Sequence, residues 1–227
     1  MIIAERKPFD ELFEMIRPYD RILVLGCGGC VTVCCAGGEK ETGLLAEELR
    51  LACATHGLQK TFHEGTLTRQ CDPEYMEEIK TPLDQLDAIL TLACGVGCNY
   101  VTDRIKERRV VVLPAVNTTF FGATEEQGVW KEKCVGCGNC ILHLTGGLCP
   151  MARCAKNISN GPCGGSNRGK CEISHEGREV DCIWAKIIER MTELGRLDEL
   201  EKIEPPRDWS TTRHGGPRKI VREDLKL

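Results

Sequence analysis

The chain has 227 residues, and 16 of them are cysteine, about 7 per cent of the total, which is an unusual excess for a soluble protein. Thirty Lys and Arg against 34 Asp and Glu leave a formal charge of -4. There is therefore no basic surplus to bind a nucleic-acid duplex. With 41% hydrophobic and 28% charged residues, the composition is that of a folded globular protein and excludes disorder of the whole chain.

The sequence offers no export or membrane signal. The first residues carry charges at Glu5, Arg6, Lys7 and Asp10, where a signal peptide has an apolar run. No run of eighteen apolar residues occurs, so we expect no membrane span and a cytoplasmic location. Thiols stay reduced there, and a disulfide framework, the alternative, is typical of short exported chains. So many reduced thiols indicate metal binding.

The first half predicts alternating helices and strands. Apolar residues at positions 9, 12, 13 and 16 predict a short helix that ends before Pro18. The apolar run over 21–26 predicts a buried strand, and a loop rich in Gly and Cys follows it. Apolar residues from Leu45 to Cys53 then predict a helix that stops at Gly57. A weak strand is predicted over 60–64, stronger strands over 87–93 and 109–115, and a helix over about 100–108.

These elements predict an α/β protein with three parts. Residues 1–129 should form a parallel, doubly wound domain of the Rossmann-like or flavodoxin-like kind. Residues 130–200 should form a small, loop-dominated, cysteine-rich domain with a helix from about Val180 to Gly195. Residues 201–227 form a polar arm. From Pro205 onward it cannot bury a core, so it is either a disordered end or an arm laid over a partner subunit.

Cysteines follow three of the predicted strands, at the edge where a parallel sheet binds its ligands. We predict a metal site drawn from Cys27, Cys30, Cys34, Cys71 and Cys94. An iron-sulfur cluster is the favoured occupant, and the alternatives are zinc, free thiols or a pair of redox-active thiols.

Three other cysteines of the first half are not assigned to this site. Cys53 lies on the apolar face of its helix and is interpreted as a small core residue. The roles of Cys35 and Cys98 stay open.

The most specific motif is Cys134-Val-Gly-Cys137-Gly-Asn-Cys140. Two successive C-x-x-C steps let one tight loop contact three corners of a [4Fe-4S] cluster, while zinc sites seldom use such a triplet. In bacterial ferredoxins the next cysteine precedes a proline and serves the other cluster. Cys149-Pro150 repeats that detail after a longer spacing.

Five more cysteines follow the triplet and bring the thiols of the second half to eight. They are Cys149, Cys154, Cys163, Cys171 and Cys182. Eight thiolates suit two [4Fe-4S] clusters, and an interleaved pairing, as in two-cluster ferredoxins, is favoured. The alternative is one cluster plus a zinc ion held by four thiolates.

No catalytic residue is predicted. None of the five histidines stands at a spacing that indicates a nucleophile and its base. Gly26-x-Gly28 begins a dinucleotide-binding fingerprint, but Val31 replaces its third glycine. The sequence indicates an electron carrier whose bond-making cofactor lies on another protein.

The cysteine motifs resemble those of the MetV family, also called the methylenetetrahydrofolate reductase C-terminal domain. The likeness is carried by the Cys134 triplet, Thr145-Gly-Gly-Leu-Cys149-Pro150, Cys154-Ala-Lys156, Asn160-Gly-Pro-Cys163-Gly-Gly165, Gly169-Lys-Cys171-Glu172 and Cys182-Ile-Trp184. In the first half it rests on Gly26-Cys27-x-x-Cys30, Gly37-Gly38-Glu39, Ala93-Cys94-Gly95 and Pro114-Ala-Val-Asn117-Thr118. It covers most of the chain and stops near Leu200.

The resemblance implies a small iron-sulfur subunit, with zinc possible in place of one cluster, that partners a flavoprotein of the MetF type in anaerobes using the reductive acetyl-CoA pathway or related one-carbon metabolism. FMN on MetF would reduce methylene-tetrahydrofolate to methyl-tetrahydrofolate, and further subunits would supply electrons. By position, the resemblance assigns metal thiols to Cys27, Cys30, Cys94 and the eight from Cys134 onward, whereas Cys34 and Cys71 come from the sheet geometry. The alternatives are a zinc-stabilised structural adaptor of the same complex without electron transfer, and a free-standing enzyme.

Overall fold

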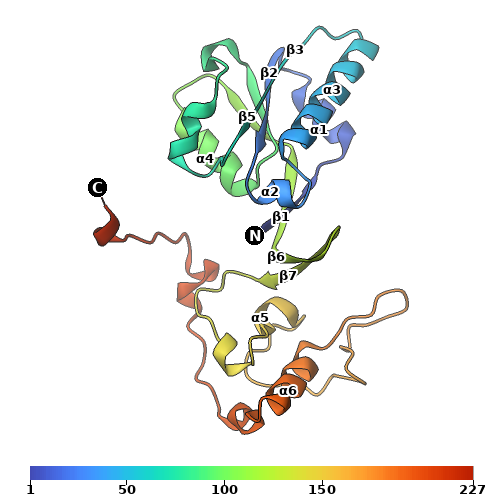
Figure 1. Ribbon diagram of the computed structural model, residues 1–227, viewed down its shortest axis with the longest axis vertical. Helices are drawn as coiled ribbons and strands as arrows, with labels where there is room; N and C mark the ends of the chain where they lie inside the picture. The colour runs from blue at the N-terminus through green and yellow to red at the C-terminus, as the bar shows by residue number, and fades with distance from the viewer. Residues whose placement is uncertain (227) are drawn as a thin grey trace. The chain divides into compact units, whose positions relative to one another are not determined.

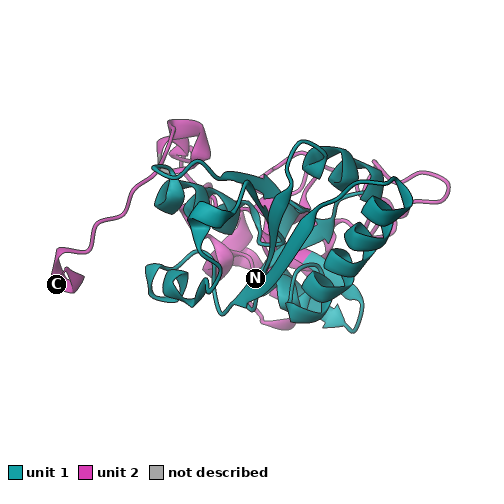
Figure 2. Ribbon diagram, turned by 90° about the horizontal axis from the view of Figure 1, so that it is seen from above, with its two compact units in different colours: residues 1–131 teal, residues 132–227 magenta. Residues whose placement is uncertain are grey.

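The computed structural model describes residues 1–226 (Figure 1). The chain divides into two compact units, residues 1–131 and residues 132–227 (Figure 2). The division falls within a strand, β7 (Val129–Cys134), which leads from the first unit into the second.

Unit 1 alternates strands and helices. Its elements are β1 (Ile2–Arg6), α1 (Phe9–Ile16), β2 (Arg21–Cys27), α2 (Cys30–Val33), α3 (Glu39–Thr55), β3 (Thr61–Leu67), β4 (Ala88–Thr91), α4 (Gly95–Ile105), β5 (Val111–Pro114) and β6 (Val116–Glu126). Short 3-10 turns at Pro73–Glu78 and Leu83–Gln85 connect β3 to β4.

The predicted parallel sheet is confirmed, with strand order β3-β2-β4-β5. Successive residues of the central strand β2 point to opposite faces, and each face has its own core. Val24 packs in the cluster that includes Leu45 of α3, and Leu25 packs in the cluster that includes Val101 of α4. Helices therefore cover both faces of the sheet (Figure 1), which is the doubly wound arrangement.

A second, three-stranded sheet with the order β1-β6-β7 was not expected from the sequence. β1 pairs antiparallel with β6, and Ile2 lies opposite Phe121. Local periodicity carries no information about a pairing between segments so far apart in the chain. The sheet brings the start of the chain against the strand that follows β5.

Helix α4 begins at Gly95, earlier than the predicted start near residue 100. Two glycines in its first turn weaken the helical pattern in the sequence. A tertiary contact compensates, because Thr118 Oγ1 accepts a 2.8 Å hydrogen bond from the Gly95 N–H. The first turn of the helix is then closed by the 3.0 Å hydrogen bond from Cys98 N to the Cys94 carbonyl. Cys98 is therefore placed in the first turn of α4.

Unit 2 is dominated by loops, as predicted. Its helices are α5 (Pro150–Arg153) and α6 (Ile183–Glu193), and 3-10 turns occur at Leu142–Leu144, Leu197–Glu201, Trp209–Thr211, Arg213–Gly215 and Glu223–Leu225. Its small core is built on α6, whose Ile187 and Met191 are fully buried. Trp184 is anchored by a 3.0 Å hydrogen bond from Nε1 to the Ile158 carbonyl. No helix among residues 1–226 has the length and apolar character that crossing a bilayer requires.

Candidate metal centre

All sixteen cysteines are free thiols, so none supports the disulfide alternative. Within residues 1–226, no three His, Cys, Asp or Glu side chains already surround a common point at the geometry of a metal site. The fit of the chain to a metal or cluster therefore rests on which thiols lie near one another and on the donors that surround them.

Three thiols converge at the carboxyl edge of the parallel sheet, as the topology predicts. Cys27 ends β2, Cys71 follows β3, and Cys94 follows β4. Cys27 and Cys94 are buried. Desolvation raises the pKa of the Cys71 thiol, and so does the proximity of Cys94 and Cys27. Three thiols from three loops thus share one neighbourhood.

Cys98 is a fourth thiol at this edge, and its role was not predicted from the sequence. Desolvation and then the proximity of Cys94 raise the pKa of its thiol. The spacing Cys94-x-x-x-Cys98 could have indicated it, because residues four apart lie on one face of a helix. Because the helix was expected to start at about residue 100, Cys94 and Cys98 were not expected to lie on one helical face.

A buried glutamine positions Cys71. Gln70 is fully buried, and its Nε2 donates to the carbonyls of Leu25 at 3.0 Å and Gly26 at 2.8 Å. Its Oε1 accepts a 2.6 Å hydrogen bond from Thr91 Oγ1. The loop after β3 is in this way held on the ends of β2 and β4, which brings Cys71 to them.

The loop between β2 and α3 is held tightly against β4. Cys27 N donates to the Gly37 carbonyl at 2.9 Å, and Thr32 Oγ1 donates to the Cys27 carbonyl at 2.8 Å. A Cβ at Gly37 would lie 2.0 Å from the Leu92 carbonyl oxygen, so only glycine fits. This close approach holds the loop carrying Cys27 next to the loop carrying Cys94.

The two other predicted thiols of unit 1 lie on or beside the short helix α2. Cys30 begins α2 and is half-buried. Cys34 is buried, and its Sγ contacts the carbonyls of Ala4 and Val31, each at 3.6 Å. Burial raises the pKa of the Cys34 thiol, to which Cys35 also contributes. One of the two carbonyls that Cys34 contacts, that of Ala4, belongs to β1. The role of Cys34 as a metal ligand stays a prediction.

In unit 2 the triplet Cys134, Cys137 and Cys140 lies on a loop with glycines at left-handed positions. Gly136 has φ 61° and Gly138 has φ 82°, a conformation that favours glycine. The Gly136 N–H donates to Cys134 Sγ at 3.3 Å. Backbone donors to cysteine sulfur are among the features that stabilise cluster ligands.

An arginine from the C-terminal arm also contacts this loop. Arg207 Nη2 donates to Cys137 Sγ at 2.7 Å and to the Asn139 carbonyl. Its Nε is buried and has no hydrogen-bond partner among the described residues. A buried donor without an acceptor indicates that an acceptor such as a water molecule, an ion or an inorganic sulfide belongs there. The arm was expected to be a free end or a cover for another subunit, and its contact with the triplet loop was not foreseen.

Four thiols that follow the triplet in the sequence of unit 2 lie near shared neighbours. Cys154 and Cys171 pack against the apolar cluster that contains buried Cys182. Lys156 Nζ lies 3.9 Å from Cys163 Sγ, and the Gly165 N–H donates to the same sulfur at 3.4 Å.

Lys156 connects these thiols electrostatically. Glu172 chiefly raises the pKa of Lys156, and the nearby thiols Cys163 and Cys171 raise it too. Cys149 immediately precedes the short helix α5, and Cys154 immediately follows it. The pairing of the eight thiols stays a prediction, but these contacts associate Cys154, Cys163, Cys171 and Cys182.

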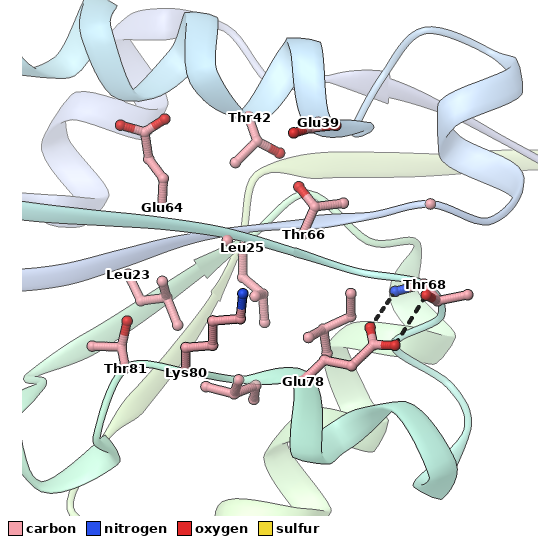
Figure 3. A pocket seen from close by; sticks show the side chains of 14 residues that line it. Leu23, Leu25, Glu39, Thr42, Glu64, Thr66, Thr68, Glu78, Lys80 and Thr81 are labelled. Atoms are coloured by element: carbon pink, nitrogen blue, oxygen red, sulfur yellow. Dashed lines mark hydrogen bonds between the residues drawn. The ribbon is translucent and has the colours of Figure 1, made fainter.

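Two open cavities differ in their relation to the thiols. One of about 590 Å³ lies beside the edge strand β3 in unit 1 (Figure 3) and is lined by Glu39, Glu64, Glu78, Lys80 and threonines, with no cysteine among its lining residues. Glu78 is fixed there by hydrogen bonds from Thr68 N and Oγ1. The other, of about 880 Å³ in unit 2, is lined by Cys137, Trp209 and His214. Of these two cavities, the second adjoins a predicted metal ligand, Cys137.

Comparison with known proteins finds a match to a protein family. Residues 113–210 match a family model described as methylene-tetrahydrofolate reductase C terminal. No curated protein matches the chain. No solved structure matches it either.

The extent of the match differs from the extent of the resemblance seen in the sequence. The matched range includes β6, β7 and the eight cysteines from Cys134 to Cys182, but it leaves the motifs around Cys27 and Cys94 outside. It also continues past Leu200, where the resemblance was expected to stop, and it includes Arg207.

Proposed function

We propose that this chain is the iron-sulfur electron-transfer subunit of a methylenetetrahydrofolate reductase complex. It would relay electrons to or from FMN on a partner flavoprotein of the MetF type, which reduces methylene-tetrahydrofolate to methyl-tetrahydrofolate. The reduction needs two electrons and two protons. The chain would pass the electrons one at a time, and the partner would supply the flavin and the folate site.

The match over residues 113–210 carries this proposal, because all eight cysteines of unit 2 lie inside it. Their surroundings fit thiolate ligands. N–H groups donate to Cys134 and Cys163, and a guanidinium contacts Cys137. A lone thiol in a loop needs none of these donors, whereas a thiolate is stabilised by each of them.

The chain's residues would hold and insulate the redox groups. When bound, iron-sulfur clusters supply single electrons at potentials between about -700 and +450 mV, set by net charge, hydrogen bonds to sulfur and solvent exposure. One cluster would be held at the triplet Cys134, Cys137 and Cys140, and the contacts described above associate Cys154, Cys163, Cys171 and Cys182 with one another. The full ligand set of each cluster stays a prediction. The first-unit thiols Cys27, Cys71, Cys94 and Cys98 form a third candidate site, with zinc as its alternative occupant.

Metal and sulfide analysis tests the proposal. Protein purified without oxygen should contain about eight iron and eight acid-labile sulfide from two four-iron clusters in unit 2, and more if the sheet edge also binds a cluster. The reduced chain should then reduce the FMN of its flavoprotein partner, followed by the loss of flavin absorbance. Protein with no acid-labile sulfide, or a loaded chain that cannot exchange electrons with the flavin, would contradict the proposal.

A second candidate is a zinc-stabilised structural adaptor of the same complex. The small core of unit 2 favours it, because five buried residues around α6 leave most of the loops without apolar support. A four-thiolate zinc ion would stabilise such loops without carrying electrons. Stoichiometric zinc, no iron and a featureless visible spectrum would establish this function in place of electron transfer.

A further inference from the structure

Part of the C-terminal arm, residues 205–226, contacts the loop that carries the cysteine triplet. Two arginines make the contact. Arg207 Nη2 donates to Cys137 Sγ at 2.7 Å, and Arg218 Nη1 donates to the Gly136 carbonyl at 2.9 Å. Both contacts lie within unit 2, and they bring residues more than 65 positions apart in sequence to one loop, with separations of 70 and 82 positions.

Arg207 is held in place by its own segment. Its guanidinium carbon lies 5.5 Å from the centre of the Trp209 ring, which in turn makes an edge contact with His214 at 6.1 Å. Thr212 between them is 3% exposed. The segment from Arg207 to His214 is therefore a compact turn that presents one guanidinium to the sulfur of Cys137, and not a loose tail.

The charge of the arm suits a negatively charged partner at this place. Residues 205–226 contain six Lys or Arg and three Asp or Glu, whereas the whole chain has a net charge of -4. A guanidinium stays protonated at every working pH. The buried Nε of Arg207 adds a donor that has no acceptor among residues 1–226, beside a sulfur that already accepts from Nη2.

We propose that Arg207 sets the reduction potential of the redox group bound by Cys134, Cys137 and Cys140, and that the arm is the cover that holds it there. This inference rests on the proposed function. A fixed positive charge at hydrogen-bond distance from a ligand sulfur stabilises the reduced form, which carries one more negative charge than the oxidised form. Arg207 therefore raises the potential.

The test is a redox titration followed by EPR, carried out on the full-length, anaerobically purified protein. Arg207→Gln removes the charge and keeps a hydrogen-bond donor. It should lower the equilibrium constant for reduction of one cluster about tenfold, which lowers the midpoint potential by about 59 mV for one electron. Arg207→Lys should stay near the wild-type value. Arg222→Gln is the matched control, because it removes the same charge from the same arm where Arg222 pairs with Asp224.

The outcomes separate this inference from the proposed function. If anaerobically purified wild-type protein contains no iron and no acid-labile sulfide, both the proposed function and this inference are overturned. A loaded Arg207→Gln protein with the wild-type potential, or an Arg222→Gln protein with an equal shift, would overturn the inference alone.

If Arg207→Gln does not retain iron, Trp209→Ala carries the test. It removes the ring beside the guanidinium and leaves the charge in the chain. It should lower the same potential by a smaller amount, and an unchanged potential would overturn the inference.

Discussion

Thr91 Oγ1 donates a 2.6 Å hydrogen bond to Gln70 Oε1, and this contact joins the loop after β3 to the end of β4. Thr91 Oγ1 also accepts a 3.1 Å hydrogen bond from the Ala93 N–H. The two residues are fully buried. The relationship fixes the positions of Cys71 and Cys94, each of which is adjacent in sequence to one end of this network.

We expect Gln70→Ala to destabilise unit 1 by about 2–3 kcal/mol, because the buried Gly26 carbonyl loses a donor and the buried Thr91 hydroxyl loses its acceptor. The Leu25 carbonyl keeps its hydrogen bond from the Leu92 N–H. The mutation should also let Cys71 react faster with an alkylating reagent. Urea denaturation and the rate of Cys71 alkylation measure the two effects. Gln85→Ala, at an exposed position, is the control. Equal stability of the two variants would show that the network does not hold the loop.

Gly37→Ala should destabilise the protein by about 3 kcal/mol, because the new methyl group meets the backbone of Leu92 at 2.0 Å. Gly43→Ala is the opposite case. Its methyl group would have ordinary contact at 3.6 Å inside helix α3, so it should stabilise the helix by about 0.5–1 kcal/mol. Thermal unfolding compares the two variants. A stable Gly37→Ala protein would mean that the loop and β4 can separate without cost.

Cys137→Ser should lower the iron content by about four per chain, the content of one cluster, and leave unit 1 folded. Unit 1 has its own two cores and does not depend on the triplet. Iron analysis and hydrogen exchange in β2 and β4 measure these effects. Cys53→Ala, which changes a buried thiol on α3, should keep all its iron. Full iron in Cys137→Ser, or loss of protection in β2, contradicts the assignment.

Acid should weaken the link between the starts of β2 and β4. Hydrogen bonds from the Arg21 side chain and backbone lower the pKa of Asp87 to about 2 from 3.8. The stabilisation is therefore complete above pH 3.8 and is lost as the pH falls through about 2. Asp87→Asn should be less stable than wild type at pH 6, and the difference should shrink between those two pH values.

Urea denaturation from pH 6 down to pH 2 measures this dependence. Asp103→Asn, at an exposed position on α4, is the control for removing one carboxylate from the surface of unit 1. A constant difference between Asp87→Asn and wild type over that range would show that the carboxylate does not contribute as an ion.

Local patterns in the sequence predicted the parts of the fold that depend on neighbouring residues. The apolar run of β2 and the helical spacing of α3 appear where expected, because burial of a strand or a helix face imposes a period of a few residues. The start of α4 was wrong, because its first turn depends on a contact from Thr118. The pairing of β1 with β6 was missed because it, too, depends on residues that are far apart in the sequence.

The sequence by itself determined the chemistry of the candidate sites: free thiols in a close triplet, and thiols after successive parallel strands. Only the tertiary structure decided which of them are neighbours. Cys98 joins Cys94 through the early start of α4, Gln70 brings Cys71 to the sheet edge, and Arg207 reaches Cys137 across 70 positions. Such contacts depend on how segments that are distant in sequence pack together, and a periodicity of two or four residues carries no information about that packing.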